Sequence, residues 1–236
     1  MVQRYMALAF AKPQMRSASD LPAILHPALR IEPQQQTAAR SRLGLNSPAP
    51  VLGLCPGAEF GPAKRWPETH YANIAERWCA QGGQVWIFGS GKDREVATSI
   101  LNHLSPTAQG QCQLLTGETS LTEAIDLLAA CAAVVCNDSG LMHITAAVGT
   151  PLVAVYGSTS TIYTPPLSER VKTVHTDIEC RPCFKRTCKF GHLKCLIELM
   201  PEQVIEAGNR LERSESEDLV IALQPVAEPA TGGEGQ

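Results

Sequence analysis

From residue 50 onward, short apolar runs alternate along the chain with stretches of helical periodicity. The apolar runs lie at 51–55, 84–88, 112–115, 133–136 and 151–156. The helical stretches lie at about 70–81, 92–104, 121–130 and 141–148. Strands that alternate with helices of this length indicate βαβ units and a parallel sheet. The last two apolar runs show no polar alternation, as expected for strands that helices cover on both faces.

The two ends of the chain lack this alternation. Residues 1–48 contain several prolines and no sustained periodicity apart from a short helix predicted at 38–45, which is typical of a lead-in or linker. A proline opens an amphipathic helix predicted at 201–213. Residues 214–236 are rich in Glu, Pro, Gly and Ala and predict a disordered tail. The pattern therefore predicts one Rossmann-like α/β domain at 49–213, with helices on both faces of a parallel sheet.

Composition and charge narrow the class of protein. The 236 residues are 44% hydrophobic and 18% charged, which is ordinary for a globular chain that can bury a core without disulfides. The net charge of −3 provides no global basic field, so we expect no nucleic-acid partner. No apolar run is long enough to cross a bilayer, and the N-terminal segment lacks a cleavage site after a long apolar core. We expect a cytoplasmic protein.

The loop after the first predicted strand carries glycines and cations. It reads Cys-Pro-Gly-Ala-Glu-Phe-Gly-Pro-Ala-Lys-Arg-Trp-Pro at 55–67. Ligands of open α/β sheets bind outside the carboxyl ends of the strands. At such a place Gly57 allows the backbone to approach a diphosphate closely, and Lys64 and Arg65 can neutralise it. The alternative is a surface loop in which Lys64 is simply solvated.

The loop after the second predicted strand is Gly-Ser-Gly-Lys-Asp at 89–93. Its glycines suit a tight turn that enters a helix. Asp93 can cap that helix by accepting hydrogen bonds from exposed backbone amides. It can also accept hydrogen bonds from ribose hydroxyls, as acidic residues do in dinucleotide-binding folds. Both roles stay open at this point.

The strongest motif is Asn-Asp-Ser-Gly-Leu-Met-His-Ile at 137–144, between a strand and a helix. Ser139, Gly140 and Leu141 present free backbone N–H groups at the helix N-terminus, where amides and the helix dipole bind phosphate oxygens. Asp138 would compete for the same amides, and its alternative role is to cap the helix. His143 lies in the first turn and either reaches the same anion or is a core histidine. Because the three loops follow parallel strands, we expect them to meet at one edge of the sheet.

The nine cysteines fall into two groups. Five lie among apolar segments and are predicted to be small core residues: Cys55, Cys79, Cys112, Cys131 and Cys136. Four are clustered together: Cys180, Cys183, Cys188 and Cys195. Four thiols at short spacing suit a tetrahedral structural zinc site, in which His192 could replace one ligand.

Two other interpretations of the cysteine cluster remain open. The thiols can be reduced and packed as structure, or they can pair in a redox reaction, although a cytosolic location disfavours disulfides. Lys185, Arg186, Lys189 and Lys194 lie among them. These cations would lower the pKa values of the thiols, or they could contact a phosphorylated ligand.

Several long strings of this sequence resemble one family of enzymes. PGAEFGPAKRWP, FGSGKD, NDSGLMHI, TPLVAVYGSTS and TPPLS are similar, in this order and spacing, to the C-terminal domain of ADP-heptose:lipopolysaccharide heptosyltransferases. The resemblance covers the chain from residue 1 to about 213. It implies a GT-B glycosyltransferase of family 9, which transfers heptose from ADP-heptose to the inner-core heptose of lipopolysaccharide with inversion.

The resemblance also implies roles for single residues. Lys64 would contact the donor diphosphate, and Asp93 would lie near the ribose. The stretch Asp138–Leu141 and His143 would bind the ADP portion, with Gly57 and Ala58 near the nucleoside. No cofactor is implied beyond the donor substrate itself. The expected partners are ADP-heptose and a lipid A–core acceptor at the inner membrane surface, where the enzyme would be peripheral.

The chain departs from the family pattern at its beginning. GT-B enzymes have two Rossmann-like domains, and the catalytic base of this family is an aspartate of the N-terminal domain, which has no counterpart here. We therefore expect residues 1–48 to be the end of that domain and the linker, 49–213 to bind the donor with a cysteine-rich insert at 180–195, and no catalytic base in this chain. A separate N-terminal polypeptide could supply it. The alternative is an ADP-sugar-binding fragment without turnover.

Overall fold

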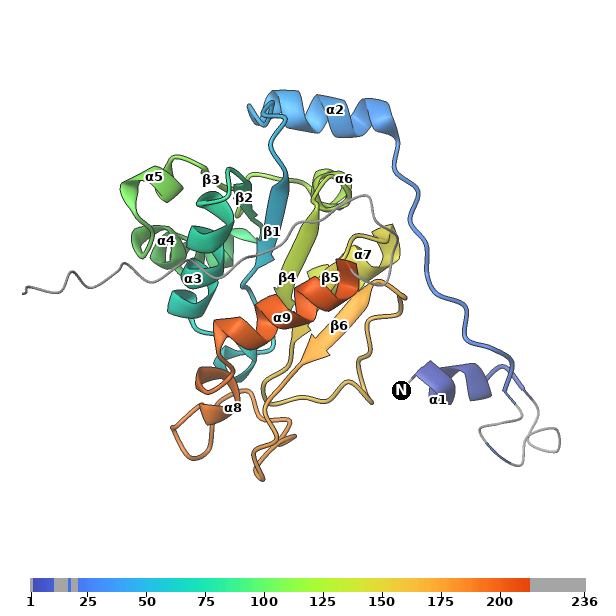
Figure 1. Cartoon of the computed structure of the whole chain (residues 1–236). Helices are drawn as coiled ribbons and strands as arrows, with labels where there is room; N and C mark the ends of the chain where they lie inside the picture. Colours follow the sequence, from blue (N-terminus) through green and yellow to red (C-terminus); the bar gives the residue numbers. More distant parts are fainter. Residues whose placement is uncertain (1, 11–16, 18–20, 213–236) are drawn as a thin grey trace, which may run out of the picture.

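The computed structural model describes residues 2–10, 17 and 21–212. Its centre is a six-stranded parallel sheet with the order β3-β2-β1-β4-β5-β6 (Figure 1). This is the strand order of a Rossmann fold, as the alternation of strands and helices predicts. The strands are β1 (Val51–Cys55), β2 (Gln84–Ile87), β3 (Cys112–Leu114), β4 (Ala133–Asn137), β5 (Leu152–Val155) and β6 (Val171–Val174).

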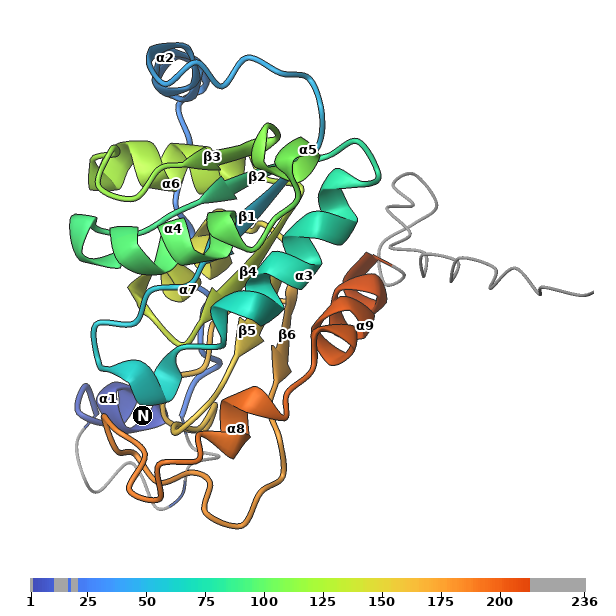
Figure 2. The same ribbon diagram turned by 90° about the vertical axis from the view of Figure 1, so that its left-hand side faces the viewer.

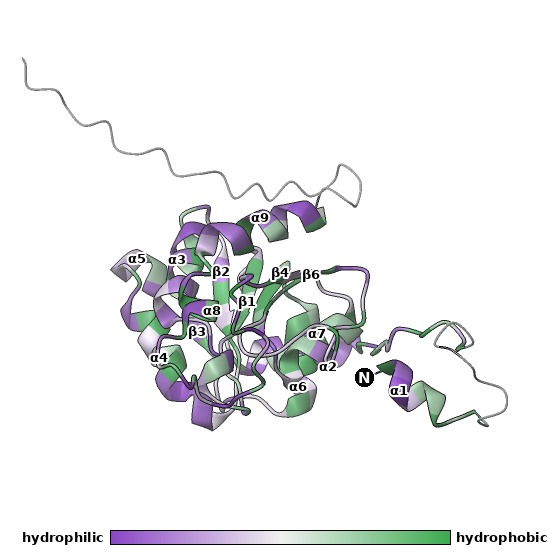
Figure 3. Cartoon of the chain, turned by 90° about the horizontal axis from the view of Figure 1, so that it is seen from below, coloured by the Kyte–Doolittle hydropathy of each residue, from purple (hydrophilic) through white to green (hydrophobic). Residues whose placement is uncertain are grey.

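Helices cover both faces of the sheet (Figure 2). One face carries α3 (Glu68–Cys79), α4 (Arg94–Asn102) and α9 (Pro201–Glu212). The other carries α6 (Leu121–Ala129) and α7 (Gly140–Val148), with α2 (Pro33–Arg42) packed against α6. Seen from below, green strands are enclosed by helices such as α9 with purple outer sides (Figure 3). The predicted α/β class, with helices on both faces, is confirmed.

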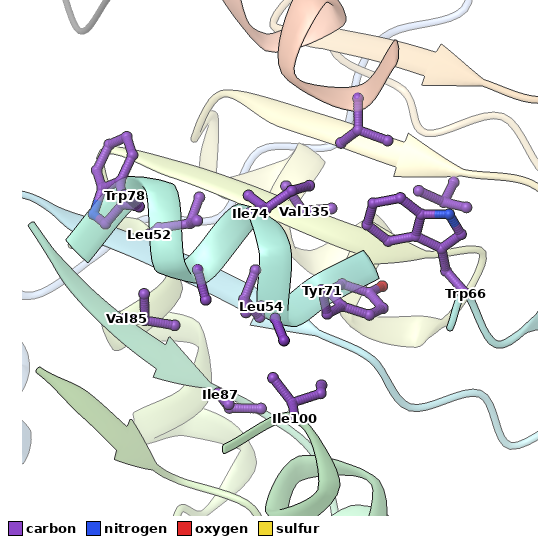
Figure 4. Packing of buried hydrophobic residues seen from close by; sticks show 14 of the residues in the cluster. Leu52, Leu54, Trp66, Tyr71, Ile74, Trp78, Val85, Ile87, Ile100 and Val135 are labelled. Carbon is purple, nitrogen blue, oxygen red and sulfur yellow. The ribbon is translucent and has the colours of Figure 1, made fainter. Parts of the chain in front are cut away.

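Two hydrophobic cores form because successive residues of a strand point to opposite faces. Leu52 and Leu54 of β1 point into the core under α3, where Trp66, Tyr71 and Ile74 are also buried (Figure 4). The intervening side chains of the strands point to the core under α6 and α7. The five cysteines outside the cluster are all buried, as predicted: Cys55, Cys79, Cys112, Cys131 and Cys136.

Some elements differ from the sequence prediction. β6 was not predicted, because this edge strand carries the two consecutive exposed residues Lys172 and Thr173 and lacks a long apolar run. α2 begins at Pro33, earlier than the helix predicted at 38–45, because a proline suits the first turn of a helix. Short helical turns also went unpredicted: α1 (Val2–Ala7), α5 (Pro106–Gln109) and α8 (Lys194–Ile197).

The topology decides where a ligand can bind. The chain moves from β1 outward to β2 and β3, then returns to add β4 on the other side of β1. At this switch point the loops after β1 and β4 diverge and leave a crevice at the carboxyl ends of the strands. Within the described ranges no helix is both long and apolar enough to cross a membrane. The predicted tail at 214–236 lies outside the described residues.

Candidate functional site

A cavity of about 380 Å³ lies at the switch point, at the carboxyl ends of the strands. All three predicted loops contribute to it, so their predicted convergence is confirmed. Of the predicted site residues, six line the cavity: Gly57, Ala58, Asp93, Ser139, Gly140 and Leu141. Lys64, Asp138 and His143 are absent from its lining.

Gly57 brings the β1 loop against the β2 loop. A Cβ atom at Gly57 would lie 2.6 Å from the carboxyl carbon and Oδ1 of Asp93. Real Cβ atoms do not approach other atoms so closely, so only glycine allows this contact without displacing Asp93. The two loops therefore form one continuous wall of the cavity.

Asp93 is placed where both roles that the sequence left open are possible. The structure shows hydrogen bonds only for the capping role. Its Oδ2 accepts hydrogen bonds from the backbone N–H of Ser90 at 2.9 Å and from the Ser90 hydroxyl at 2.8 Å. This caps the short helix η4 (Gly91–Asp93) that leads into α4. Asp93 also lines the cavity, where Oδ1 has no hydrogen bond in the described structure, so a ribose contact stays a prediction.

The N-terminus of α7 opens into the cavity. Its N-cap is Ser139, in extended conformation and without a side-chain capping hydrogen bond. The first amides of α7 are therefore left for a ligand, and Gly140 adds no side chain in front of them. Amides and dipole together make this end a binding place for phosphate oxygens.

Asp138 turns away from those amides. Its Oδ2 lies 2.6 Å from Lys64 Nζ and accepts a 2.5 Å hydrogen bond from the Thr159 hydroxyl. The interpretation of Asp138 as a helix cap is wrong, because Lys64 and Thr159 satisfy its carboxylate. The alternative of a solvated Lys64 is also wrong, since the residue is buried. The charge of Asp138 is thereby compensated, and it does not oppose an anion at α7.

Asn137 is a positioning residue that the sequence analysis missed. It is fully buried at the end of β4, and its Nδ2 donates a 2.6 Å hydrogen bond to the Pro56 carbonyl. Its Oδ1 accepts from the Trp66 backbone at 3.1 Å and from the Tyr71 hydroxyl at 3.0 Å. Asn137 thus holds both ends of the β1 loop. Its place directly before Asp138, inside the strongest motif, was the available signal.

His143 is exposed on α7, so its interpretation as a core histidine is wrong. Partial desolvation lowers the pKa of its imidazole, with Asp138 opposing and Lys64 reinforcing the shift. The burial therefore favours the neutral imidazole over the charged one before any anion binds.

A fourth segment of the cavity wall was also missed. The loop after β3 and the first turn of α6 contribute Thr119, Ser120, Leu121 and Ala124. Ser120 and Glu123 form a reciprocal capping box there. Ser-Leu-Thr-Glu at 120–123 is the sequence signature of such a box, and it could have indicated this helix start.

The clustered cysteines lie around a separate, small cavity of about 10 Å³, which all four thiols and His192 line. The thiols are free. Backbone N–H groups, chiefly that of Leu193, lower the pKa of Cys188, whereas burial and the neighbouring thiols raise the pKa of Cys195 to about 11. Among the residues that the structure describes, no three His, Cys, Asp or Glu side chains are arranged to hold a metal ion. The zinc prediction gains no support from this arrangement.

The cysteine-rich segment supports the β1 loop directly. The backbone N–H of Ala63, next to Lys64, donates to the Arg186 carbonyl at 3.0 Å. Phe184 donates to the Ser158 carbonyl at 2.8 Å. The segment therefore holds the two loops that surround the Lys64–Asp138 pair.

Known proteins are similar to this chain over most of its length. The sequence profile of "Glycosyltransferase family 9 (heptosyltransferase)" matches residues 1–194. The chain is 44% identical over 212 residues to lipopolysaccharide heptosyltransferase 2 of Escherichia coli K12, covering 89% of this chain and 61% of that protein. It is 46% identical over 216 residues to lipooligosaccharide heptosyltransferase 2 of Haemophilus influenzae, covering 89% and 62%.

A solved structure shows the same architecture. The E. coli ADP-heptose lipopolysaccharide heptosyltransferase II aligns with a TM-score of 0.80 and 44% identity, covering 91% of this chain and 62% of that one. The chain thus spans less than two thirds of the length of these relatives. From the profile match and these identities, the chain belongs to glycosyltransferase family 9, the heptosyltransferases.

Proposed function

We propose that this chain is the donor-binding half of an inverting heptosyltransferase that moves heptose from ADP-heptose to the inner-core heptose of lipopolysaccharide. The observation that carries the proposal is the uncapped N-terminus of α7, which opens into a 380 Å³ cavity at the switch point of the sheet. The names of the similar heptosyltransferases support the choice of donor and pathway.

The site suits the departure of a nucleoside diphosphate. In the transfer, the bond between the anomeric carbon and the ADP oxygen breaks, and the acceptor hydroxyl oxygen bonds to that carbon. Negative charge builds up on the departing diphosphate, where the amides of Ser139–Leu141 and the dipole of α7 stabilise it. Lys64 adds positive charge beside them, partly offset by Asp138. The proton of the acceptor hydroxyl passes to a base, which we place in an N-terminal half.

The acceptor side of the proposal rests on charge. Lys185, Arg186 and Lys189 are exposed in the cysteine-rich segment, on the same edge of the sheet as the donor loops. We propose that they contact the phosphorylated lipid A–core acceptor and that the protein works in the cytoplasm, peripheral on the inner membrane. A separate N-terminal polypeptide is the proposed partner.

Calorimetric titration with ADP tests the donor site. Folded protein should give saturable heat with 1:1 stoichiometry, and folded protein without heat would remove the proposal. A transfer assay with ADP-heptose and heptose-bearing acceptor then distinguishes the two forms of the function. Binding without transfer would identify an ADP-sugar-binding fragment that has no turnover on its own.

Metal at the cysteine cluster is a separate and finer proposal. It rests on the four cysteines lining one small cavity, although among the described residues no three such side chains are arranged to hold a metal ion as they stand. The thiols would have to move closer together to bind zinc. Metal analysis of protein purified under reducing conditions decides the point, since less than about one equivalent would leave the cysteines as packing residues.

A further inference from the structure

The start of α6 forms one wall of the cavity and contacts a residue far outside the loops after β1, β2 and β4. Ser120 and Leu121 begin α6 and line the cavity together with Ala124 one turn later. This wall does not follow directly on a strand, because a loop separates it from the end of the short β3. Its position is therefore determined by what holds the first turn of α6.

The first turn is held from within by Glu123. One carboxylate oxygen, Oε2, accepts hydrogen bonds from the Ser120 backbone N–H at 2.9 Å and from its hydroxyl at 3.0 Å. The Ser120 hydroxyl in turn accepts from the Glu123 backbone N–H at 3.3 Å. The other oxygen, Oε1, is left to bond outward.

Arg42 takes that outward position. Its Nε donates to Glu123 Oε1 at 2.6 Å, and its Nη2 donates to the Glu118 carbonyl at 2.9 Å. One guanidinium thus hydrogen-bonds both to the α6 capping box and to the loop before it. The bond to the Glu123 carboxylate is strengthened by the opposite charges. Arg42 is the last residue of α2, which packs against α6 and lies above it in Figure 1.

Two further contacts hold the same region, in addition to the ion pair between Arg42 and Glu123. Gln36, also on α2, donates to the Asp126 carbonyl of α6 at 2.8 Å. Arg94 donates to the Thr116 carbonyl at 3.0 Å and pairs with Glu118, on the other side of the same loop. The guanidinium of Arg42 lowers the pKa of Glu123 to about 2, together with the Ser120 amide, so the carboxylate stays charged.

We propose that Arg42 is a positioning residue for donor binding: through Glu123 it holds the Ser120–Leu121 wall of the nucleotide cavity in place. This rests on the proposed donor site. α2 lies in the segment before β1, so Arg42 also ties that segment to the occupancy of the cavity. By reciprocity, a nucleotide that orders the wall strengthens the contact between α2 and α6.

The test compares Arg42→Ala and Arg42→Lys with Arg77→Ala. Arg77 forms a similar bridge between helices, to Glu202 of α9, on the opposite face of the sheet and away from the cavity. The dissociation constants of ADP and inorganic pyrophosphate are measured by competition against a fluorescent ADP analogue. Pyrophosphate is expected to contact only the α7 end of the cavity. Its Kd should therefore change little when the Ser120–Leu121 wall is displaced.

Arg42→Ala should raise the Kd of ADP about fivefold or more and leave that of pyrophosphate within about twofold. Arg42→Lys keeps a positive charge beside Glu123 and should therefore recover part of the affinity for ADP. Arg77→Ala should bind ADP as the wild type does. A Glu123→Gln variant should lose affinity as well, and adding Arg42→Ala to it should cause little further loss.

Each other outcome overturns the inference in a recognisable way. Equal ADP affinity of Arg42→Ala and wild type would show that the wall holds itself. Equal losses for ADP and pyrophosphate, or for Arg42→Ala and Arg77→Ala, would show a general loss of structure instead of positioning. If the wild type itself does not bind ADP, the proposed donor site fails, which is a different result from these.

Discussion

Lys64 Nζ lies 2.6 Å from Asp138 Oδ2, and the two side chains are 11% and 3% exposed. They come from loops 74 residues apart in the sequence and meet beside the uncapped end of α7. This pairing explains how an acidic residue can stand next to the proposed diphosphate site. The carboxylate holds the lysine in place, and the lysine keeps the carboxylate away from the amides.

The first prediction concerns the stability that this buried pair controls. Lys64→Met or Asp138→Asn alone leaves one buried group without its charged partner and should lower the free energy of unfolding by about 3–5 kcal/mol. The double variant should cost clearly less than the sum. Denaturant unfolding measures all three. The exposed pair of Arg210 and Glu206 is the control, and Arg210→Ala should cost about 0.5 kcal/mol or less. Additive losses at Lys64 and Asp138 would contradict the pairing.

The second prediction concerns the close approach of the β1 and β2 loops. Gly57→Ala places a Cβ where the Asp93 carboxylate lies, so it should displace Asp93 and lower stability by about 1–3 kcal/mol. ADP binding should weaken with it. Gly91→Ala is the control in the neighbouring loop, because a Cβ there meets nothing within 4 Å. Thermal unfolding and ADP titration should show the loss at Gly57 and little change at Gly91; similar behaviour of the two would be the contrary result.

The third prediction separates binding from stability at α7. Gly140→Ala meets no atom within 4 Å, so the protein should stay folded, with a gain of up to about 1 kcal/mol from the helical alanine. The new methyl group stands where phosphate oxygens would approach the amides, so the Kd of ADP should rise about tenfold or more. Parallel unfolding and titration experiments give both values. Unchanged ADP affinity would move the phosphate site elsewhere.

The fourth prediction follows the lowered pKa of Glu123. Its folded pKa of about 2 lies below the ordinary value, because Arg42 and the Ser120 amide favour the carboxylate. The stabilisation is therefore complete above the ordinary pKa of about 4.3 and is lost as the pH falls toward 2. Glu123→Gln should be less stable than wild type at pH 6, and the difference should shrink between about pH 4 and pH 2. A difference that does not change with pH would show that the charge of Glu123 contributes nothing.

The fifth prediction concerns His143, whose pKa is lowered chiefly by desolvation. A diphosphate bound at α7 would raise that pKa, and ADP binding would then take up a proton. The affinity advantage of wild type over His143→Gln should therefore grow as the pH falls from about 7.5 to 5.5. His103→Gln, at the exposed C-cap of α4, is the control and should follow the wild type. Parallel pH profiles for all three proteins would exclude a contact between His143 and the anion.

Local patterns carried much of this architecture. The apolar runs predicted five of the strands at nearly their observed bounds, because a strand covered on both faces has to be apolar along its length. The Gly-rich loops predicted the cavity, because parallel strands bring their carboxyl ends to one edge. The sequence did not predict β6, because an edge strand needs no continuous apolar run. Lys172 and Thr173 are exposed on it.

The roles of single polar residues were decided by tertiary contacts. Whether Asp138 capped α7 or did something else depended on Lys64 and Thr159, which the sequence places in other loops. Asn137 and Arg42 showed no local signal for the partners they bond, since these lie 81 residues away in each case. The periodicity of apolar residues is local, so the sequence alone determined five of the six strands, the long helices and the edge of the sheet where the cavity lies. Hydrogen-bond partners depend on which loops meet in space, so only the folded chain decided how the loops around the cavity are held.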